Sequence, residues 1–95
     1  MPYRASNIGE DLVSHKLEKD QCVYIHWLDS TNMMGGWVYD KLTAKAKDIE
    51  TVGFIVDVND KAVMVSSTRS DSGGVVNPIS IPLGCIQDTR LFEIR

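Results

Sequence analysis

The segment spanning residues 52–68 constrains the fold more than any other part of this chain. Residues 52–58 and 62–68 are two short runs rich in Val, Ile and other residues that favour strands. Between them lie Asn59, Asp60 and Lys61, and Asn and Asp favour turns because their side chains bond to nearby backbone groups. The pattern predicts a β-hairpin whose turn is Asn59-Asp60.

Three further short strands are expected around this hairpin. They cover residues 22–29, where apolar and polar residues alternate, residues 78–82, and residues 86–94. Residues 83–86 are expected to form a tight turn directly before the last strand. Five short strands arranged in this way predict a mainly β fold, with a small SH3-like or Sm-like barrel as the first choice and an OB-like barrel as the second.

Two short helical segments are also predicted. Residues 7–19 begin with Asn7 as a plausible N-cap and Glu10 in the position of a capping box, which favours a short N-terminal helix or extension. Residues 40–48 are expected to form one or two helical turns with Leu42 and Ala46 facing inward. At 95 residues the chain has the length of one domain, with residues 1–20 as the extension and residues 21–95 as the barrel.

Charge and composition exclude several classes of function. The formal net charge is −3, and no run of Lys or Arg is long enough to follow a phosphate backbone, so duplex nucleic acid is an unlikely partner. The longest apolar run is far shorter than the 18 or more residues that a membrane span needs, and no signal peptide is expected. Two cysteines are too few for a disulfide scaffold, so the cytoplasm is the expected location.

Neither a metal site nor a catalytic site is expected. Cys22, His26 and Cys85 have the side chains of zinc ligands, but residues four apart on a strand are separated by about 13 Å. The chain lacks a G-x-S-x-G elbow, and the apolar neighbours of Cys85 would disfavour its thiolate. We therefore expect a protein that is not an enzyme and that carries no cofactor.

The candidate binding residues lie in two polar segments. Trp27 is expected to pack in the core with Val23 and Ile25, and Asp29 is expected to accept backbone N–H bonds from Thr31 or Asn32. Trp37 follows two glycines and is either a core residue or the aromatic wall of a site. A site between the two segments would comprise the following residues: Asp29, Ser30, Asn32, Trp37, Tyr39, Ser66, Ser67, Thr68 and Arg69.

The order of four short motifs resembles that of a group of small phage- and prophage-encoded proteins of unassigned function. The motifs are Trp27-Leu28-Asp29, Gly36-Trp37, the segment 51–56 with its V-G-F sequence, and the Ile-Pro-x-x-x-Ile segment 81–86. The resemblance covers residues 22–94 and implies an SH3-like barrel of viral origin, located in the cytoplasm of a host cell. It implies no reaction.

Three functions remain open from the sequence. The first is a small-ligand binder, in which hydroxyls and a guanidinium at residues 66–69 hold a small anionic or nucleotide-like ligand, as in an anti-defence sponge for a nucleotide-derived immune signal. The second is an SH3-like adaptor or inhibitor of a host protein, with Tyr24, Trp37 and Tyr39 lining a peptide groove. The third, less favoured, is a single-stranded nucleic-acid binder. A homo-oligomer is expected because the exposed strand edges of a small barrel can be covered by another copy.

Overall fold

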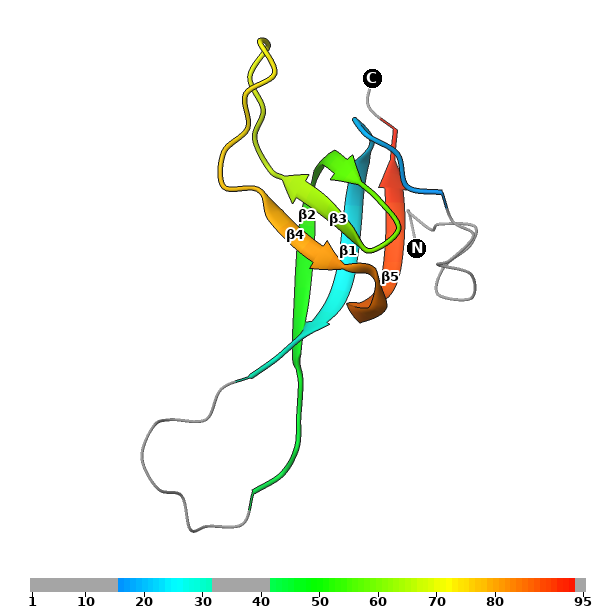
Figure 1. Ribbon diagram of the computed structural model, residues 1–95, viewed down its shortest axis with the longest axis vertical. Coiled ribbons are helices and arrows are strands. Elements are labelled where there is room, and N and C mark those ends of the chain that lie inside the picture. Colours follow the sequence, from blue (N-terminus) through cyan, green and yellow to red (C-terminus); the bar gives the residue numbers. More distant parts are fainter. Residues whose placement is uncertain (1–15, 32–41, 94–95) are drawn as a thin grey trace.

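The computed structural model describes residues 16–31 and 42–93, which form one antiparallel sheet (Figure 1). The elements are β1 (Cys22–Asp29), β2 (Lys47–Val58), β3 (Ala62–Ser66), β4 (Ile79–Pro82), the 3-10 turn η1 (Leu83–Cys85) and β5 (Ile86–Phe92). The strand order across the sheet is β4-β3-β2-β1-β5. The prediction of a mainly β fold with five strands is therefore confirmed.

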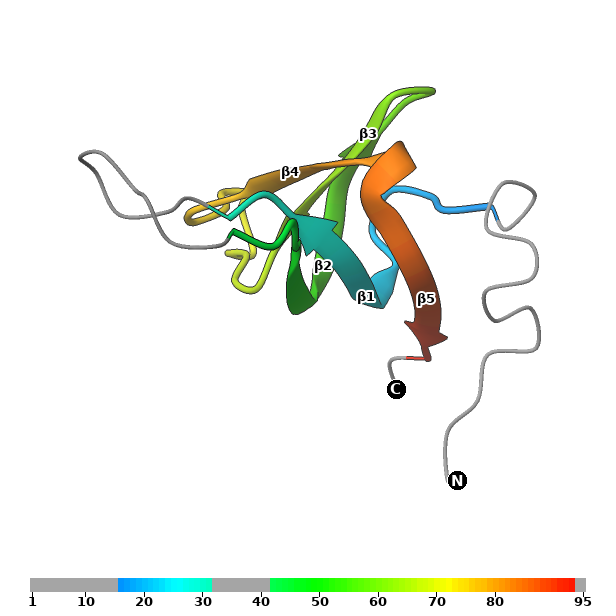
Figure 2. The ribbon, with the colours of Figure 1, turned by 90° about the horizontal axis from the view of Figure 1, so that it is seen from below.

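The sheet is not closed into a barrel, and the prediction of a closed barrel is wrong. Strands β4 and β5 are the two edges of the sheet and are not hydrogen-bonded to each other. The sheet bends along β2, so that β3 and β4 run at a large angle to β1 and β5 (Figures 1 and 2). The turn η1 joins the two edges covalently, but β4 has only four residues and pairs with β3 alone.

The bend is possible because β2 is long and is shared between two partners. Residues 47–54 of β2 pair with β1, and the pairs with β3 begin at Phe54 and include a register shift between Ile55 and Asp57. Gly53 lies where the strand passes from one partner to the other. A Cβ atom at this position would lie 2.5 Å from the carbonyl oxygen of Ser66 and 2.7 Å from Cγ1 of Val65, so only glycine allows this approach.

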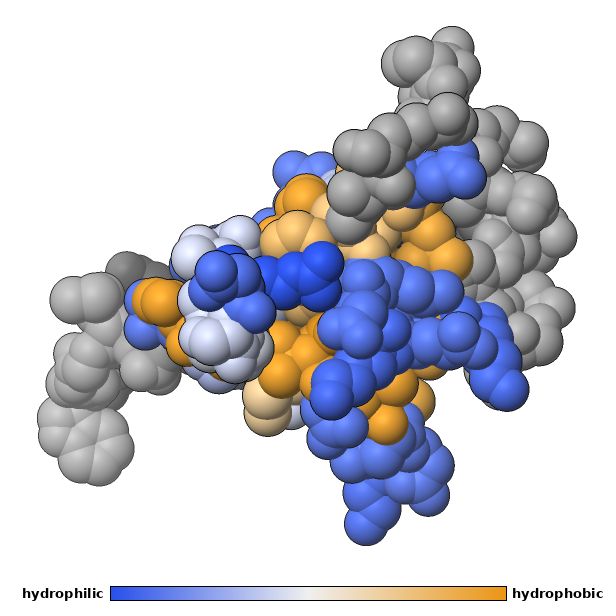
Figure 3. All heavy atoms as spheres, turned by 90° about the horizontal axis from the view of Figure 1, so that it is seen from above, coloured by the Kyte–Doolittle hydropathy of each residue, from blue (hydrophilic) through white to orange (hydrophobic). Residues whose placement is uncertain are grey.

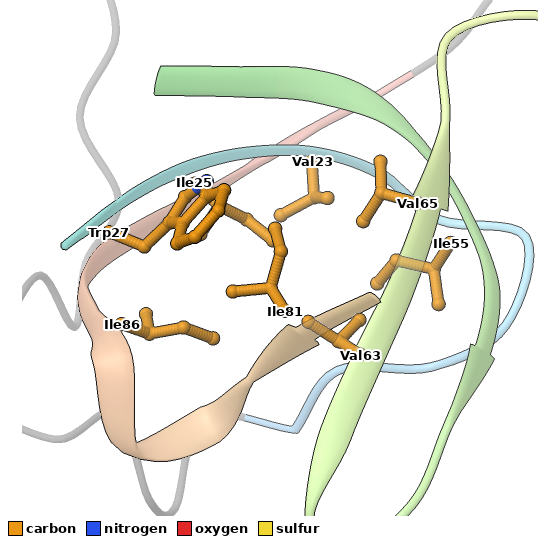
Figure 4. Packing of buried hydrophobic residues seen from close by; sticks show 8 residues of the cluster. All are labelled: Val23, Ile25, Trp27, Ile55, Val63, Val65, Ile81 and Ile86. Atoms are coloured by element: carbon orange, nitrogen blue, oxygen red, sulfur yellow. The ribbon is translucent and has the colours of Figure 1, made fainter. Parts of the chain in front are cut away.

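The core lies on the concave side of the bent sheet (Figure 4). Its fully or nearly buried members are Val23, Ile25, Trp27, Ile55, Val63, Val65, Ile81 and Ile86. The predicted inward face of the first strand is confirmed, including Trp27, which is 6% exposed. The indole N–H of Trp27 donates to the hydroxyl of Thr51 at 3.0 Å, so the polar edge of the ring is satisfied within the sheet.

The predicted hairpin is confirmed, but its turn has a different physical basis. The side-chain oxygen of Asn59 accepts the backbone N–H groups of Lys61 at 2.8 Å and of Ala62 at 3.0 Å. Asn and Asp tolerate a positive φ, but neither Asn59 nor Asp60 adopts one. Among the described non-glycine residues, only Asp20 and Asn77 have a positive φ. The side chain of Asn59 therefore closes the turn, and β3 ends at Ser66, two residues earlier than predicted.

The predicted helical turn near residues 40–48 is wrong for the residues that are described. Residues 42–46 have no regular structure, and Lys47 and Asp48 already belong to β2, while residues 40 and 41 lie outside the described part. Leu42 is 56% exposed and therefore has no core contact that would stabilise a helix. In contrast, β2 pairs with every residue of β1, and this ladder outweighs a weak helical preference.

A helix was predicted over residues 7–19. Residues 7–15 lie outside the described part of the chain, and residues 16–19 are not helical. Leu17 packs against the core instead. The N–H of Asp20 donates to the carbonyl of Ile55 at 2.8 Å, and the N–H of Ile55 donates to the carbonyl of Gln21 at 2.8 Å. The segment before β1 therefore extends the contact between the first and second strands.

Replacing Gly53 by Ala should destabilise the protein by about 1–3 kcal/mol, because the added methyl group meets backbone that cannot move without disturbing the β2–β3 pairing. Urea denaturation followed by tryptophan fluorescence measures the effect. Gly84→Ala is the matched control, since a Cβ atom there meets nothing within 4 Å. Equal stability of the Gly53→Ala variant and the wild type would contradict the role assigned to this approach.

Candidate functional site

The structure places the described residues of the two predicted segments at opposite ends of the sheet (Figure 1). Asp29 pairs with Lys47 at one end of β1, whereas Ser66 pairs with Phe54, which in turn pairs with Cys22 at the other end. Seven residues of strand correspond to about 23 Å. The structure therefore does not bring the described residues of these two segments together, and Asn32, Trp37 and Tyr39 lie outside the described residues.

Asp29, Ser30 and Thr31 are engaged at the point where the chain leaves β1. The Asp29 carboxylate accepts the N–H of Ser30 at 2.8 Å, whereas the predicted donors were Thr31 or Asn32, of which Asn32 lies outside the described residues. The hydroxyl of Thr31 donates to the carbonyl of Lys45 at 3.2 Å and so links the two sides of this end of the sheet. These contacts are of the kind that shape a turn.

Ser66 has a structural role rather than a binding role. Ser66 is 1% exposed, and its hydroxyl donates to the carbonyl oxygens of Thr68 and Val76, each at 2.8 Å. The same oxygen accepts the N–H of Thr68 at 3.3 Å. This hydroxyl therefore holds together the base of the loop between β3 and β4 and does not face a ligand, in contrast to the exposed Ser67 and Thr68.

The polar loop at residues 69–75 is a small hairpin closed by its own hydrogen bonds. Arg69 and Val75 form a β-bridge, and the N–H of Ser70 donates to the carbonyl of Gly74 at 2.8 Å. The hydroxyl of Ser70 accepts the N–H of Gly74 at 2.9 Å. Gly73 has a φ of +92°, a conformation that side-chain-bearing residues rarely adopt. These contacts set the position of Arg69 at the base of the small hairpin.

Arg69 lies over the ring of Phe54. Its guanidinium carbon is 3.9 Å from the ring centroid, which is the geometry of a cation–π contact. Nη1 of Arg69 also lies 3.4 Å from a carboxylate oxygen of Asp20, and the Arg69 side chain is 39% exposed. Such an exposed ion pair is weak. The guanidinium is therefore held in place by the ring while part of its surface faces solvent.

A groove of about 530 Å³ opens beside Arg69. It lies between the segment before β1, the second half of β2 and the small hairpin, and its lining residues are Lys19, Asp20, Phe54, Ile55, Val56, Arg69, Ser70, Asp71, Gly73 and Val75. Figure 3 views the molecule from this end, where hydrophilic residues surround smaller apolar areas. The groove has the size of a small-molecule site, and its two basic side chains are balanced by two acidic ones.

Of the predicted site residues that the structure describes, only Arg69 lines this groove. Phe54 was not among the predicted residues, yet the sequence contains a signal for it. Alternation along the predicted strand 52–58 places Phe54 on the face opposite Ile55, and the structure shows that Gly53 and Ile55 are the buried ones. Asp20 and Lys19 have no comparable signal, because their position depends on how the segment before β1 packs against β2.

A second polar cluster lies on the outer face of the sheet, which we define as the surface formed by the non-core side chains of β1, β5 and residues 47–54 of β2. The Tyr24 hydroxyl donates to Glu50 at 2.8 Å, Nε2 of His26 lies 2.7 Å from a carboxylate oxygen of Asp48, and Arg90 lies 3.3 Å from Asp88. Partial burial, together with the Glu50 carboxylate, raises the pKa of Tyr24 above its usual value of 10.0. Tyr24 therefore remains a neutral donor at physiological pH.

Among the described residues, no three His, Cys, Asp or Glu side chains gather in a way that could hold a metal ion. Cys22 and His26 lie on the same strand four residues apart, and Cys85 lies in η1. Both cysteines are free thiols. Residues 16–31 and 42–93 contain no helix long and apolar enough to cross a membrane.

The chain matches no protein-family model, no curated protein and no solved structure. The resemblance to small phage proteins therefore stays a prediction.

Replacing Ser66 by Ala should destabilise the protein by about 1–3 kcal/mol, because the carbonyl groups of Thr68 and Val76 would lose their buried partner. Ser67→Ala, at the adjacent exposed position, should change stability by no more than about 0.5 kcal/mol. Thermal or urea unfolding of both variants measures the difference. A Ser66→Ala variant that unfolds like the wild type would show that this hydroxyl does not hold the loop.

Proposed function

We propose that this protein is a non-enzymatic binding protein whose groove beside Arg69 takes a small anionic ligand with a planar group, such as a nucleotide derivative. The observation that carries the proposal is the half-exposed Arg69 guanidinium stacked at 3.9 Å on Phe54. Stacking fixes the plane of the guanidinium, so less conformational entropy is lost when its N–H groups bind a phosphate or carboxylate.

The charged side chains of the groove favour binding of a phosphate group over the contact between Arg69 and Asp20. Asp20 lies at 3.4 Å from Arg69 and occupies the guanidinium in the absence of a ligand. A phosphate has more acceptor oxygens and more charge than a carboxylate, so it would displace this long contact and make shorter ones. Lys19 lines the same groove and supplies a second positive charge.

Apolar and backbone groups of the groove suit the planar part of the ligand. Phe54, Ile55, Val56 and Val75 line it together with Gly73, whose lack of a side chain allows close approach of a ligand to the backbone. Binding rather than catalysis is favoured because the described lining residues include no histidine or cysteine, and the one serine hydroxyl among them is engaged within the small hairpin.

The strand order and the 3-10 turn before the last strand support an SH3-like arrangement of this open sheet. If the chain is a phage protein, as the motif order predicts, sequestering a nucleotide-derived immune signal is the role that this proposal implies.

Calorimetric titration with ADP-ribose, cyclic dinucleotides and inorganic phosphate tests the proposal. Arg69→Gln should weaken binding at least about 10-fold, because a charge-assisted hydrogen bond is lost. Asp20→Asn should strengthen binding several-fold, since the competing carboxylate is removed while its shape is kept. Lys61→Gln removes the same charge as Arg69→Gln but lies in the β2–β3 turn outside the groove, so it should leave the affinity unchanged.

The proposal would be overturned if no compound in this panel bound at millimolar concentration. It would also be overturned if the Arg69→Gln and Lys61→Gln variants bound one of them with equal affinity.

A further inference from the structure

We propose that the first half of β2, residues 47–52, binds an extended basic segment of another protein as an added strand. We call this part of β2 the open half-strand. The inference does not rest on the ligand proposed for the groove, because residues 47–52 do not line that groove. It rests on backbone hydrogen-bonding groups that the bend of the sheet leaves without a partner, and on the charges of the side chains beside them.

The bend leaves one side of the open half-strand without a neighbouring strand. β1 pairs with β2 from Lys47 to Phe54, whereas the pairing of β3 with β2 begins only at Phe54 (Figure 1). Residues 47–52 therefore have a strand on one side only, although β2 lies in the middle of the strand order. Among the described residues, no backbone hydrogen bond reaches residues 47–52 from the β3 side.

The register identifies the backbone groups that face the open side. The N–H of Ile55 donates to the segment before β1 and its carbonyl accepts from that segment, so Ile55 faces β1. Alternation along an antiparallel ladder then turns the N–H and C=O groups of Asp48, Glu50 and Val52 away from β1. All three residues are exposed. Each of them therefore offers one donor and one acceptor to a strand on the open side.

The open half-strand differs from the two edges at the ends of the strand order. β4 has four residues, follows Pro78 and ends at Pro82, and proline has no N–H to donate. The ladder between β5 and β1 is interrupted by a register shift between His26 and Trp27. Prolines and bulges are means by which native sheets prevent pairing with another chain. Residues 47–52 have neither of these protections.

The outer face beside the open side is acidic. Asp48 and Glu50 are exposed there, and each carboxylate accepts one hydrogen bond from a β1 side chain, so each keeps free acceptor capacity. Farther across the same face, on β5, Asp88 and Arg90 lie 3.3 Å apart and offset each other's charge. Lys47 does not offset the two β2 carboxylates in the same way, because alternation places its side chain on the opposite face.

The opposite face of the open half-strand suits apolar side chains. Ile49 packs against the core, and the Thr51 hydroxyl accepts the indole N–H of Trp27 at 3.0 Å. The side chains of an added strand alternate as those of β2 do. Those beside Ile49 and Thr51 would extend the core, whereas those on the other face would meet the carboxylates. The partner is therefore an extended segment in which basic residues alternate with β-branched apolar ones.

A second copy of the chain fits this edge less well. When two β2 strands pair antiparallel, one register alone uses the free groups of Asp48, Glu50 and Val52 in both copies, and it places the two Glu50 side chains opposite each other. Like charges directly opposite each other destabilise a sheet. The net charge of −3 adds to the repulsion between copies and favours association with a basic partner.

A synthetic peptide with this pattern tests the proposal on the full chain. In Ser-Thr-Val-Lys-Val-Arg-Ser, antiparallel pairing places Thr, Lys and Arg opposite Val52, Glu50 and Asp48. Fluorescence anisotropy of the labelled peptide measures the Kd, and Ser-Thr-Val-Glu-Val-Glu-Ser is the matched control of opposite charge. The basic peptide should bind at least about 10-fold more tightly than the acidic one. No binding of the basic peptide at millimolar concentration, or equal binding of the two peptides, would overturn the proposal.

Methylation of single amides in the basic peptide is the control for strand pairing. The N–H of its Lys faces Glu50, so N-methylation there should raise the Kd about 10-fold or more, because one hydrogen bond is lost and a methyl group enters the ladder. N-methylation of the Val before this Lys, whose N–H faces away from β2, should change the Kd by less than about 3-fold. Equal effects at the two positions would contradict strand addition.

A charge exchange in the protein tests the location of the site. Glu50→Lys should weaken binding of the basic peptide at least about 10-fold and strengthen binding of the acidic one. Asp57→Lys is the matched control, since Asp57 is also exposed on β2 but lies in the half that pairs with β3. It should change the Kd of either peptide by less than about 3-fold. Circular dichroism establishes that each variant is folded.

Equal effects of Glu50→Lys and Asp57→Lys would place the peptide elsewhere and overturn the proposal. A wild-type dimer that Val52→Pro dissociates, measured by sedimentation velocity, would identify a second copy as the occupant instead, because proline removes a free N–H from the edge. Arg69→Gln should leave the peptide Kd unchanged, so failure of this proposal is distinguishable from failure of the groove proposal.

Discussion

The close approach of β2 and β3 at Gly53 underlies both the bend of the sheet and the position of the groove. A Cβ atom at this position would lie 2.5 Å from the carbonyl oxygen of Ser66, so the two backbones meet at a distance that no other residue allows. Because β2 bends here, its first part pairs with β1 and its second part with β3. One strand thereby serves both halves of the sheet and encloses a core of β-branched side chains and Trp27.

The same approach determines where the candidate site forms. Phe54 follows Gly53 and faces away from the core, and it pairs with Ser66, after which the chain leaves the sheet. The buried hydroxyl of Ser66 fixes the base of the loop, and three residues later Arg69 lies over the Phe54 ring. The groove is therefore a consequence of the bend and of a single buried hydroxyl, rather than of a recognisable sequence motif.

Parts of the fold could be predicted because they depend on local pattern. The hairpin between β2 and β3 follows from two apolar runs and an intervening Asn59-Asp60 pair, and the inward face of β1 follows from alternation. The prediction of a helical turn near residues 40–48 is wrong for the described residues 42–48, since Leu42 is exposed and the β1–β2 ladder extends to Lys47. Arg69 was named as a candidate because it is a lone cation in a polar, glycine-containing segment, and the structure places it in the groove, whereas its partner Phe54 was not named.

The mainly β class, the hairpin and the burial of Trp27 follow from the local pattern of residues, because period-two alternation and turn residues act over a few positions. The packing of distant segments, in contrast, sets that β4 and β5 remain open edges and that Asp29 and Ser66 lie at opposite ends of the sheet. Packing also brings Asp20, 49 positions before Arg69, into the same groove. Such contacts depend on strand order and register, which are set by packing between distant segments and not by the local pattern of residues.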